Sequence, residues 1–497
     1  MKGLMRNKLI EAASQYLMFG LLVVMSLRLP NDPDMGWHLR NGQDVISNLS
    51  VPRGDIYSWT MPGYPWVAHE WLTDVLMAFI HSIAGLWGLV VVFAAIIVGA
   101  FYIASSIHIK STLMRSLIAI ITLLVSWNII GARPQMITLL GVAVVLYVLF
   151  AYRDQRSSRI IYWLPPLFAL WANLHGGFVA GFAIIMLFIT GEFIRRVLLA
   201  KPSKKILKNI RPIIKFRPLI IVSAISFLAT FINPYGWRVY QELIQTYSDS
   251  AILGSISEWI GVNLLQTSGY NIAILGILLV VLLAANRWRV DITKLVIAVA
   301  MFYVGISSWR HMPLFAVASI PLLAEQFDLL ISRGLSDMSQ KIIMPLVVLL
   351  LTAGMGYNYF SVSIPALSSP KNYGLYLNYP AGPVEYLRNN PKNRKLLNEY
   401  NWGGYLIWQL PEQKVFIDGR MAIWKDNGTE IFWEFKKLLG AEKEPAMAGL
   451  KEWNIDTVLT KASHPINFFL SNSDDGWSQV YADNLYVIWE RDTKSLQ

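Results

Sequence analysis

Long apolar runs dominate the first 360 residues of the chain. The first covers residues 9–30, and later runs lie at residues 73–107, 117–130, 136–152, 160–173, 178–194, 219–231, 272–285, 292–307, 313–331 and 342–360. A bilayer-crossing helix needs roughly 20 apolar residues, and the shorter runs with Pro or Gly suggest broken helices. The first run has no small-x-small cleavage site after it, so we expect an uncleaved span. The pattern predicts a polytopic α-helical membrane protein with about eleven transmembrane helices.

The pattern changes at about residue 361, where charge increases and apolar residues begin to alternate with polar ones. Alternation at residues 414–418, 456–460 and 486–490 predicts strands, and the periodicity of residues 430–439 and 444–453 predicts helices. The chain is therefore predicted to contain a transmembrane domain at 1–360, whose first outer loop covers 31–70, and a soluble α/β domain at 361–497.

Composition agrees with a membrane protein, since 55% of the residues are hydrophobic, 15% are charged and the mean hydropathy is +0.43. The chain has no cysteine, which excludes disulfides, thiolate metal sites and cysteine nucleophiles. Its net charge of +11 needs no nucleic-acid partner, because the basic residues can be explained by membrane topology.

Loops rich in Lys and Arg alternate along the chain with loops that are poor in them. The loops on one side of the predicted spans hold 22 Lys and Arg residues, and those on the other side hold six. Basic residues favour the cytoplasmic side, so we expect a cytoplasmic N-terminus and an extracytoplasmic C-terminal domain. Nine of the 22 lie between Arg195 and Arg217. Plain topology explains that loop, and binding to anionic lipid is the alternative.

The first outer loop is unusually rich in acids and imidazoles. Its candidate catalytic residues are Asp32, Asp34, His38, His69 and Glu70. A carboxylate in a partly dry cavity can take a proton from an acceptor hydroxyl or amide, as a general base. The alternative is an outer loop that carries ordinary solvated acids.

Metal binding is a second possibility for the same residues. Asp34 and His38 could hold a divalent cation, Mg²⁺ or Mn²⁺, that neutralises a leaving phosphate. Guanidinium groups match phosphate oxygens, so Arg40, Arg133 and Arg310 are candidate phosphate ligands. The last two arginines could equally be anchors at the membrane interface.

Further polar clusters occur at or near the outer ends of the predicted spans. They are R-P-Q (133–135), N-L-H-G-G (173–177), N-P-Y-G-W (233–237), S-E-W (257–259) and W-R-H (309–311). Polar groups near hydrocarbon tend to face a cavity, so His175, Glu258 and His311 join the candidate substrate-binding residues. Taken singly, N-L-H-G-G could be a helix break and N-P-Y-G-W a structural turn.

The loop sequence D-M-G-W-H-L-R (34–40) is similar to the D-P-W-Y-H-x-R pattern of archaeal-type oligosaccharyltransferase catalytic subunits. The topology resembles that of the GT-C superfamily of polyprenyl-phosphate-sugar glycosyltransferases. The chain also resembles a group of uncharacterised bacterial membrane proteins with D-x-D-x-x-W-H-L, N-L-H-G, R-H-x-P-L-F and D-G-R segments. The resemblance implies a GT-C-like fold, a lipid bilayer, a polyprenyl-phosphate-linked sugar donor, and Asp34 as the catalytic or metal-binding acid.

The C-terminal segments N-W-G-G-Y-L-I-W (401–408) and V-F-I-D-G-R (415–420) resemble the W-W-D-Y-G-Y signature of those enzymes and the D-G segment after it. The resemblance makes Trp402, Tyr405, Asp418 and Arg420 acceptor-binding or structural residues. The signature Asp has no counterpart here, because Gly403 and Gly404 occupy its region. Recognition of an asparagine sequon is therefore not implied.

The leading hypothesis is an integral membrane glycosyltransferase that passes a sugar to a lipid, glycan or protein at the outer face of the cell membrane. A transporter is one alternative, but it would place ionisable residues near the middle of spans and often have related halves. The other is a membrane scaffold or sensor whose outer domain binds a ligand, with Asp418 and Arg420 as its candidate contacts.

Overall fold

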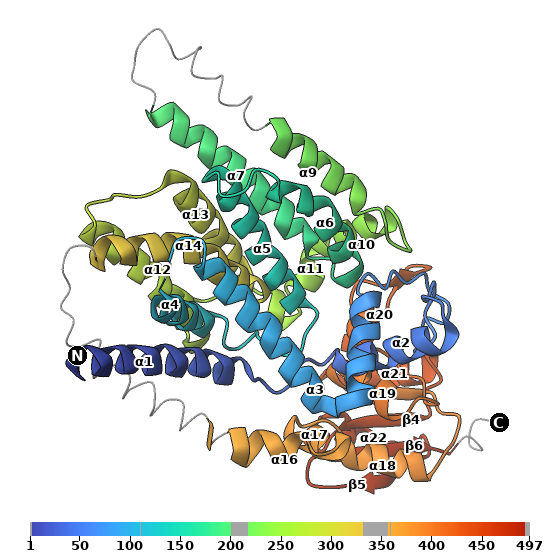
Figure 1. Ribbon diagram of the computed structural model, residues 1–497. Coiled ribbons are helices and arrows are strands. Elements are labelled where there is room, and N and C mark those ends of the chain that lie inside the picture. The colour runs from blue at the N-terminus through green and yellow to red at the C-terminus, as the bar shows by residue number, and fades with distance from the viewer. Residues whose placement is uncertain (1, 110, 200–216, 332–355, 358, 493–497) are drawn as a thin grey trace. The chain divides into compact units, whose positions relative to one another are not determined.

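The computed structural model describes residues 2–109, 111–199, 217–331, 356–357 and 359–492 (Figure 1). The chain forms two compact units. The helical unit contains Met1–Leu29, Val90–Trp237 and Leu253–Phe360. The mixed unit contains Pro30–Leu89, Arg238–Ile252 and Ser361–Gln497. The first outer loop thus belongs with the C-terminal residues, whereas the sequence pattern had placed it with the transmembrane domain.

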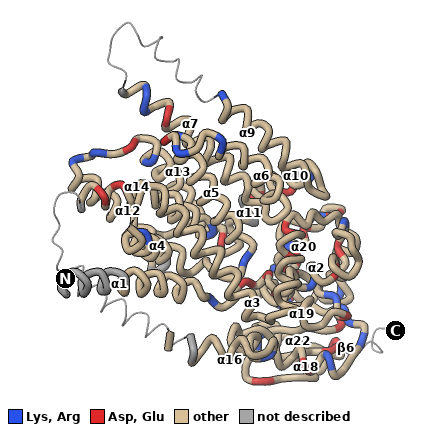
Figure 2. Tube along the Cα trace, viewed as in Figure 1, with Lys and Arg blue, Asp and Glu red and all other residues tan. Residues whose placement is uncertain are grey.

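Four described helices are long and apolar enough to cross a membrane. They are α3 (Trp71–Ser105), α5 (Gln135–Arg153), α7 (Phe178–Leu199) and α14 (Met312–Ile331), the last two counted over Phe178–Leu198 and Trp309–Leu330. Shorter apolar helical stretches are Gln15–Ser26 of α1 (Lys2–Ser26), α4 (Thr112–Val125), Ile160–Leu174 with α6 (Leu164–Leu174), α9 (Arg217–Ala229), Gly269–Ala285 of α12 (Thr267–Ala285) and α13 (Ile292–Ser307). Figure 2 shows few charged residues along these helices. Most of the expected span at 342–360 and of the basic loop at 195–217 lies outside the described residues.

Packing in the helical unit is centred on α13, which contacts both α7 and α14, while α5 contacts α7. Helix α13 begins at a capped end, because the Asp291 carboxylate accepts hydrogen bonds from the backbone N–H groups of Thr293 and Lys294. Helix α14 contains Pro321, and α3 changes direction at Gly85, whose φ of 58° is open to glycine at no steric cost. The predicted helix breaks at Pro165, Pro166, Gly176 and Gly177 fall at the ends of α6 and before α7.

The mixed unit is built on a four-stranded sheet of order β1-β4-β6-β5. Its strands are β1 (Leu396–Asn398), β4 (Thr457–Lys461), β5 (Trp477–Ala482) and β6 (Tyr486–Arg491). Strands β1 and β4 are parallel, and the other pairs are antiparallel, with Val458 opposite Trp489 and Leu459 opposite Ile488. The first four residues of β4 are buried, so this central strand has little exposure on either face.

Helices accompany the sheet and the first loop within the mixed unit. They are α2 (Met35–Asn48), α10 (Arg238–Ser248), α16 (Ile364–Leu367), α17 (Pro370–Tyr376), α18 (Ala381–Asn389), α19 (Gly403–Gln409), α20 (Ile431–Leu438), α21 (Lys443–Glu452) and α22 (Ile466–Ser471). Helix α19 packs against α2, which brings a C-terminal helix onto the first outer loop.

The predicted strands at 456–460 and 486–490 are confirmed as β4 and β6, and the two predicted helices as α20 and α21. The predicted strand at 414–418 is wrong. Val415, Phe416 and Ile417 are buried there, but the segment is not a strand of the sheet and forms a single parallel bridge from Val415 to Ser58 of the first loop. The apolar residues of this segment reflect its burial and not pairing with a neighbouring strand.

Candidate functional site

Asp34 stands at the start of α2, in a turn where its carboxylate does not cap the backbone of the helix. The Asp34 N–H donates to Oδ1 of Asp32 at 3.1 Å, and the Met35 N–H donates to the Asp32 carbonyl. Asp34 occupies the N-cap position but makes no side-chain cap hydrogen bond. The buried Asp32 therefore stabilises the turn, whereas the Asp34 carboxylate remains for other chemistry.

Three glycines allow the backbone of two C-terminal segments to reach this turn. A Cβ atom on Gly419, in the D-G-R segment, would overlap Oδ1 of Asp34. A Cβ on Gly404 would overlap the Pro33 carbonyl, and one on Gly36 would overlap the Gly404 carbonyl. The glycine pair that replaces the signature acid thus allows α19 to lie close to α2, and Gly419 lies against Oδ1 of Asp34.

The surroundings of Asp34 favour its neutral form. Burial and the neighbouring charge of Asp32 raise the pKa of the Asp34 carboxyl to about 7, although His38 and Trp37 act in the opposite direction. A carboxyl whose pKa lies near neutrality can both accept and release a proton under ordinary conditions.

His38 lies on the buried side of α2 and is held by acids of α3 and its N-terminal flank. Its Nδ1 donates to Oδ1 of Asp74 at 2.6 Å, and its Nε2 lies 3.6 Å from Oε2 of Glu70. Asn41 donates its amide to the other Asp74 oxygen at 2.6 Å. Burial lowers the pKa of His38, but Asp74 and Glu70 outweigh it, so the pKa is raised to about 9. His38 is thus an imidazolium that fastens α2 to α3.

The expected divalent cation does not fit the donor set around Asp34. The described residues contain no group of three or more His, Asp or Glu arranged to hold a metal ion. His38 carries protons on both ring nitrogens, and a metal ligand needs a lone pair on one of them.

The other candidates of the first loop make local contacts. His69 places Nε2 at 3.8 Å from Oε1 of Glu70 and Nδ1 at 3.3 Å from the Val67 carbonyl. Arg40 pairs with Asp44 one turn further along α2, at 3.1 Å. This arginine is thereby engaged with a carboxylate of its own helix.

Asp418 and Arg420 form a buried ion pair in the mixed unit. Arg420 donates from Nε and Nη2 to the two Asp418 oxygens at 2.8 and 2.7 Å, and its Nη2 also lies 2.9 Å from Asp55. The guanidinium lies over the rings of Trp66 and Tyr57. These contacts give the pair a structural role, because they join the D-G-R segment to the first loop.

Trp402 and Tyr405 belong to the core of the mixed unit. Both are almost fully buried, and the Tyr405 hydroxyl donates to the Pro370 carbonyl at 3.2 Å. Trp402 packs edge-on against Tyr486 of β6. Of the two roles open to these residues, the structure favours packing over acceptor contact.

Three outer polar clusters meet in the helical unit. Arg133 donates to Oε1 of Glu258 at 2.6 Å, the Ser308 hydroxyl donates to the Glu258 carbonyl, and the Arg310 guanidinium lies 5.0 Å from the Trp259 ring centre. Burial raises the pKa of Glu258, but Arg133 and Arg310 outweigh it, so its pKa lies below the ordinary value.

The two arginines of this cluster differ in their availability to an anion. Arg133 is neutralised by Glu258 and buried. Arg310 has no carboxylate within 4 Å among the residues that the structure describes. His311 packs edge-on against Trp259 from the next position along the chain. Arg310 is therefore the cation of this cluster that is open to a phosphate.

The N-L-H-G-G segment holds a histidine of defined tautomer. The Gly177 N–H donates to His175 Nδ1 at 2.9 Å, and the Thr138 hydroxyl lies 2.7 Å from the same atom. Trp171 donates to the Thr138 hydroxyl in turn, which leaves that hydroxyl to donate to the ring. An accepting Nδ1 places the proton of a neutral imidazole on Nε2, which is then a hydrogen-bond donor. In N-P-Y-G-W, Asn233 closes a turn by accepting from the Tyr235 N–H.

No protein-family model matches the chain, and no curated protein matches it in sequence. Solved structures of the Archaeoglobus fulgidus oligosaccharyltransferase match it over 90% of its length. The chain has the oligosaccharyltransferase fold. The structure tethered to an acceptor peptide with an NVT sequon aligns at a TM-score of 0.54 with 12% identity, and the chain covers 68% of it. The apo form aligns at 0.52 with 10% identity and 69% coverage.

A third structure of that protein, in complex with Zn and sulfate, aligns at a TM-score of 0.50 with 13% identity and 67% coverage of its chain. At these identities the likeness is one of fold. It confirms the expected GT-C-like architecture of a helical membrane protein with a C-terminal α/β domain.

Several residues at the site escaped sequence reasoning. Asp74 holds His38 and accepts a hydrogen bond from Asn41, and Gly36, Gly404 and Gly419 permit the close approach at Asp34. A lone acid in the first turn of a long apolar helix was the available signal for Asp74. In the sequence, the G-G pair is a departure from a signature and the D-G pair is part of a resemblance, although glycines also permit close backbone contact.

Proposed function

We propose that the chain is an integral membrane glycosyltransferase that moves a sugar from a polyprenyl-phosphate-linked donor to a lipid, glycan or protein acceptor at the extracytoplasmic face. The fold of the chain supports this proposal at the level of the superfamily. The observation that carries it is Asp34, a carboxylate that makes no cap hydrogen bond to the backbone of its own helix and whose pKa is raised to about 7 by burial and Asp32.

In the proposed reaction, Asp34 is the general base. It takes the proton from an acceptor hydroxyl or amide while the acceptor atom forms a bond to C1 of the donor sugar. The bond between C1 and the phosphate oxygen breaks, and the electron pair leaves with the polyprenyl phosphate. In-line attack inverts the configuration at C1.

The oxygen of the leaving phosphate needs positive charge or hydrogen-bond donors as its bond to C1 breaks. His38 does not contact substrate in this scheme. It positions the helix that carries Asp34 through Asp74 and Glu70.

The decisive test replaces Asp34 with Asn in the full chain, purified in detergent. Sugar transfer from a polyprenyl-phosphate-linked hexose is expected to fall by about 10²- to 10⁴-fold, the usual contribution of a general base. Asp426→Asn, which changes an exposed acid of the same unit, serves as the matched control and keeps its activity. Both variants are expected to retain the melting temperature of a folded protein. Full turnover by the Asp34 variant would remove the central claim.

A further inference from the structure

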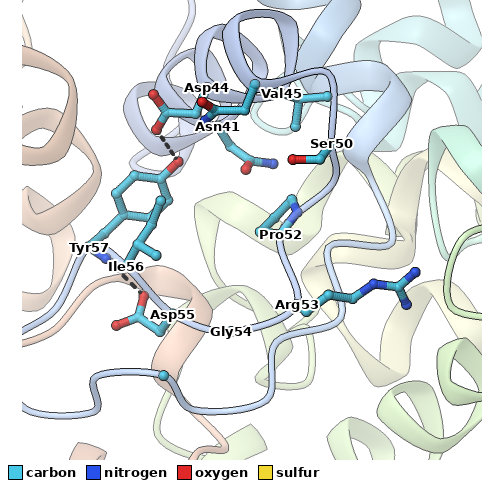
Figure 3. A pocket seen from close by; sticks show the side chains of 12 residues that line it. Asn41, Asp44, Val45, Ser50, Pro52, Arg53, Gly54, Asp55, Ile56 and Tyr57 are labelled. Atoms are coloured by element: carbon cyan, nitrogen blue, oxygen red, sulfur yellow. Dashed lines mark hydrogen bonds between the residues drawn. The ribbon is translucent and has the colours of Figure 1, made fainter.

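A cavity of about 330 Å³ lies in the mixed unit, beside α2 (Figure 3). Its lining residues come from α2 and the loop after it: Asn41, Asp44, Val45, Asn48, Ser50, Pro52, Arg53, Gly54, Asp55, Ile56, Tyr57 and Gly63. The volume is at the small end of the range for ligand sites, which suits one or two sugar rings better than a large ligand.

The cavity is built by a fixed loop. Helix α2 ends at Leu49, whose φ of 51° and ψ of 32° turn the chain sharply toward Ser50. The Asp55 N–H donates to the Tyr64 carbonyl at 2.9 Å, and the Gly63 N–H donates back to the Asp55 carbonyl at 2.8 Å. This pairing holds the loop opposite α2, so the two walls of the cavity are in place before a ligand arrives.

The acids of the cavity are already balanced by arginines. Oδ2 of Asp44 accepts from the Tyr57 hydroxyl at 2.7 Å and from Arg40 at 3.1 Å. Asp55 pairs with Arg420 at 2.9 Å. Neither carboxylate therefore needs a cation from the ligand.

Several hydrogen-bond acceptors in the lining of the cavity remain available to the hydroxyl groups of a neutral ligand. Oδ1 of Asp44 has no hydrogen-bond partner among the described residues. The side-chain amide of Asn41 goes to Asp74, which leaves its carbonyl oxygen as an acceptor. Asn48 and Ser50 are exposed and supply both donors and acceptors, while Val45 provides an apolar surface. Hydroxyl-to-carboxylate hydrogen bonds are short and strong, so this lining fits a neutral polyhydroxyl compound.

We infer that this cavity binds a neutral saccharide unit of the acceptor, a hexose or an N-acetylhexosamine. The inference rests on the proposed function, because it names the substrate class of the Asp34 site. Asn41 follows Asp34 by seven residues on the same helix, which is about 10 Å along the axis. Arg40 and Arg420 are engaged with Asp44 and Asp55, and the side chain of Arg53, the arginine in the lining, points away from Asn41 and Asp44 (Figure 3). The cavity wall at α2 therefore presents no guanidinium to a phosphate, which places the sugar on the acceptor side rather than the donor side.

The test measures binding rather than transfer. Saturation-transfer NMR on the full chain in detergent uses glucose, galactose, N-acetylglucosamine and N-acetylgalactosamine one at a time, with glucuronate as the anionic counterpart. At least one neutral sugar is expected to bind to the wild-type protein, and glucuronate to bind at least about tenfold more weakly. Asp44→Asn is expected to weaken binding by about tenfold through loss of a charged acceptor.

Asn48→Trp fills the cavity, and Ser47→Trp is its matched control, because Ser47 is an equally exposed neighbour on α2 that does not line the cavity. Binding is expected to disappear in the first variant and persist in the second. It is also expected to persist in Asp34→Asn, and to be unaffected by a water-soluble farnesyl-phosphate hexose.

The inference is overturned if no neutral sugar binds, if binding survives Asn48→Trp, or if the donor analogue displaces the sugar. Loss of transfer in Asp34→Asn without any sugar binding would refute this inference and leave the proposed function standing. Sugar binding by a protein whose Asp34 variant transfers normally would refute the proposed function instead.

Discussion

At the scale of single residues, Asp34 illustrates how surroundings give one of several acids a distinct chemistry. Asp32 accepts a backbone hydrogen bond, Asp44 and Asp55 are paired with arginines, and Asp74 holds His38. Asp34 alone of these five caps no backbone N–H and pairs with no cation within 4 Å among the described residues. Composition had shown a loop rich in acids, but not which acid was left for catalysis.

This assignment predicts a pH profile for sugar transfer. A general base must be ionised, so the rate is expected to rise with pH and to level off above about pH 7, the value to which burial and Asp32 raise the pKa of Asp34. Below that value the rate should fall about tenfold per pH unit. His38 stays charged throughout this range, because its pKa is raised to about 9, and so does not cause the acid limb. Steady-state rates between pH 5 and 8 check the profile.

A rate that does not vary between pH 5 and 7 would contradict the role of Asp34 as a base of near-neutral pKa. The residual activity of Asp34→Asn serves as the control, since it should lack the acid limb.

At the scale of elements, the pairing of α2 with α19 decides where Asp34 lies. Gly36 and Gly404 face each other so closely that neither position has room for a methyl group. Close contact between helix backbones requires such residues, whereas the hydrophobic pattern of either helix indicates only that one face is buried. The sequence pattern placed this segment in an outer loop and did not predict that α19 packs against it.

Gly36→Ala should therefore separate the two helices and displace Asp34. We expect a loss of about 1–3 kcal/mol in the free energy of unfolding, the usual cost of overpacking, together with at least a tenfold loss of sugar transfer. Gly20→Ala is the matched control, because a Cβ at Gly20 in α1 meets no atom within 4 Å. Thermal melting in detergent and transfer assays distinguish the two. Equal behaviour of both variants would show that the close approach does not position Asp34.

At the scale of the whole molecule, buried charges lie in the helical unit as well as in the mixed unit. Glu192 of α7 is fully buried, and its carboxylate receives hydrogen bonds from Arg195 and from the Thr293 hydroxyl of α13. Arg153 of α5 lies 3.4 Å from it and 2.7 Å from Asp291. One acid thus connects three helices, where the sequence pattern had shown only basic loops.

Removing the charge of Glu192 should destabilise the helical unit. Breaking a buried ion cluster by removing one partner costs about 3–5 kcal/mol, because the remaining charges lose their compensation. Glu192→Gln is therefore expected to lower the melting temperature of the detergent-solubilised protein. Glu385→Gln, which removes an exposed pair with Lys371, should leave it unchanged. Unchanged melting of the Glu192 variant would show that the hydrogen bonds suffice without the charge.

We also propose that residues 1–360 hold the chain in the cell membrane, with a cytoplasmic N-terminus, and that residues 361–497 form an extracytoplasmic domain. The chain has no cysteine, so single cysteines report topology without background. Lys414→Cys should react with a membrane-impermeant maleimide in intact cells, whereas Arg156→Cys should react only after permeabilisation. The reverse labelling would invert the proposed topology.

The sequence by itself determined the class of the protein, most of the apolar helices, and strands β4 and β6. It did so because hydrophobic periodicity is a local property. Each run shows which face of a segment is buried, and this does not depend on which other segment buries it. The segment at 414–418 shows the limit of such a prediction. Its pattern indicated that it is buried, but not that it contacts Ser58.

Only the tertiary structure decided the chemistry of the first loop. Asp34 lies against Gly419, and Asp55 pairs with Arg420, across several hundred residues of chain. Burial, the charges of neighbours and the carbonyl groups that approach a glycine depend on distances in space, which neighbours along the chain do not reveal. For that reason the sequence could nominate the acids of the loop, while the fold distinguished the one left for catalysis from those that hold the structure together.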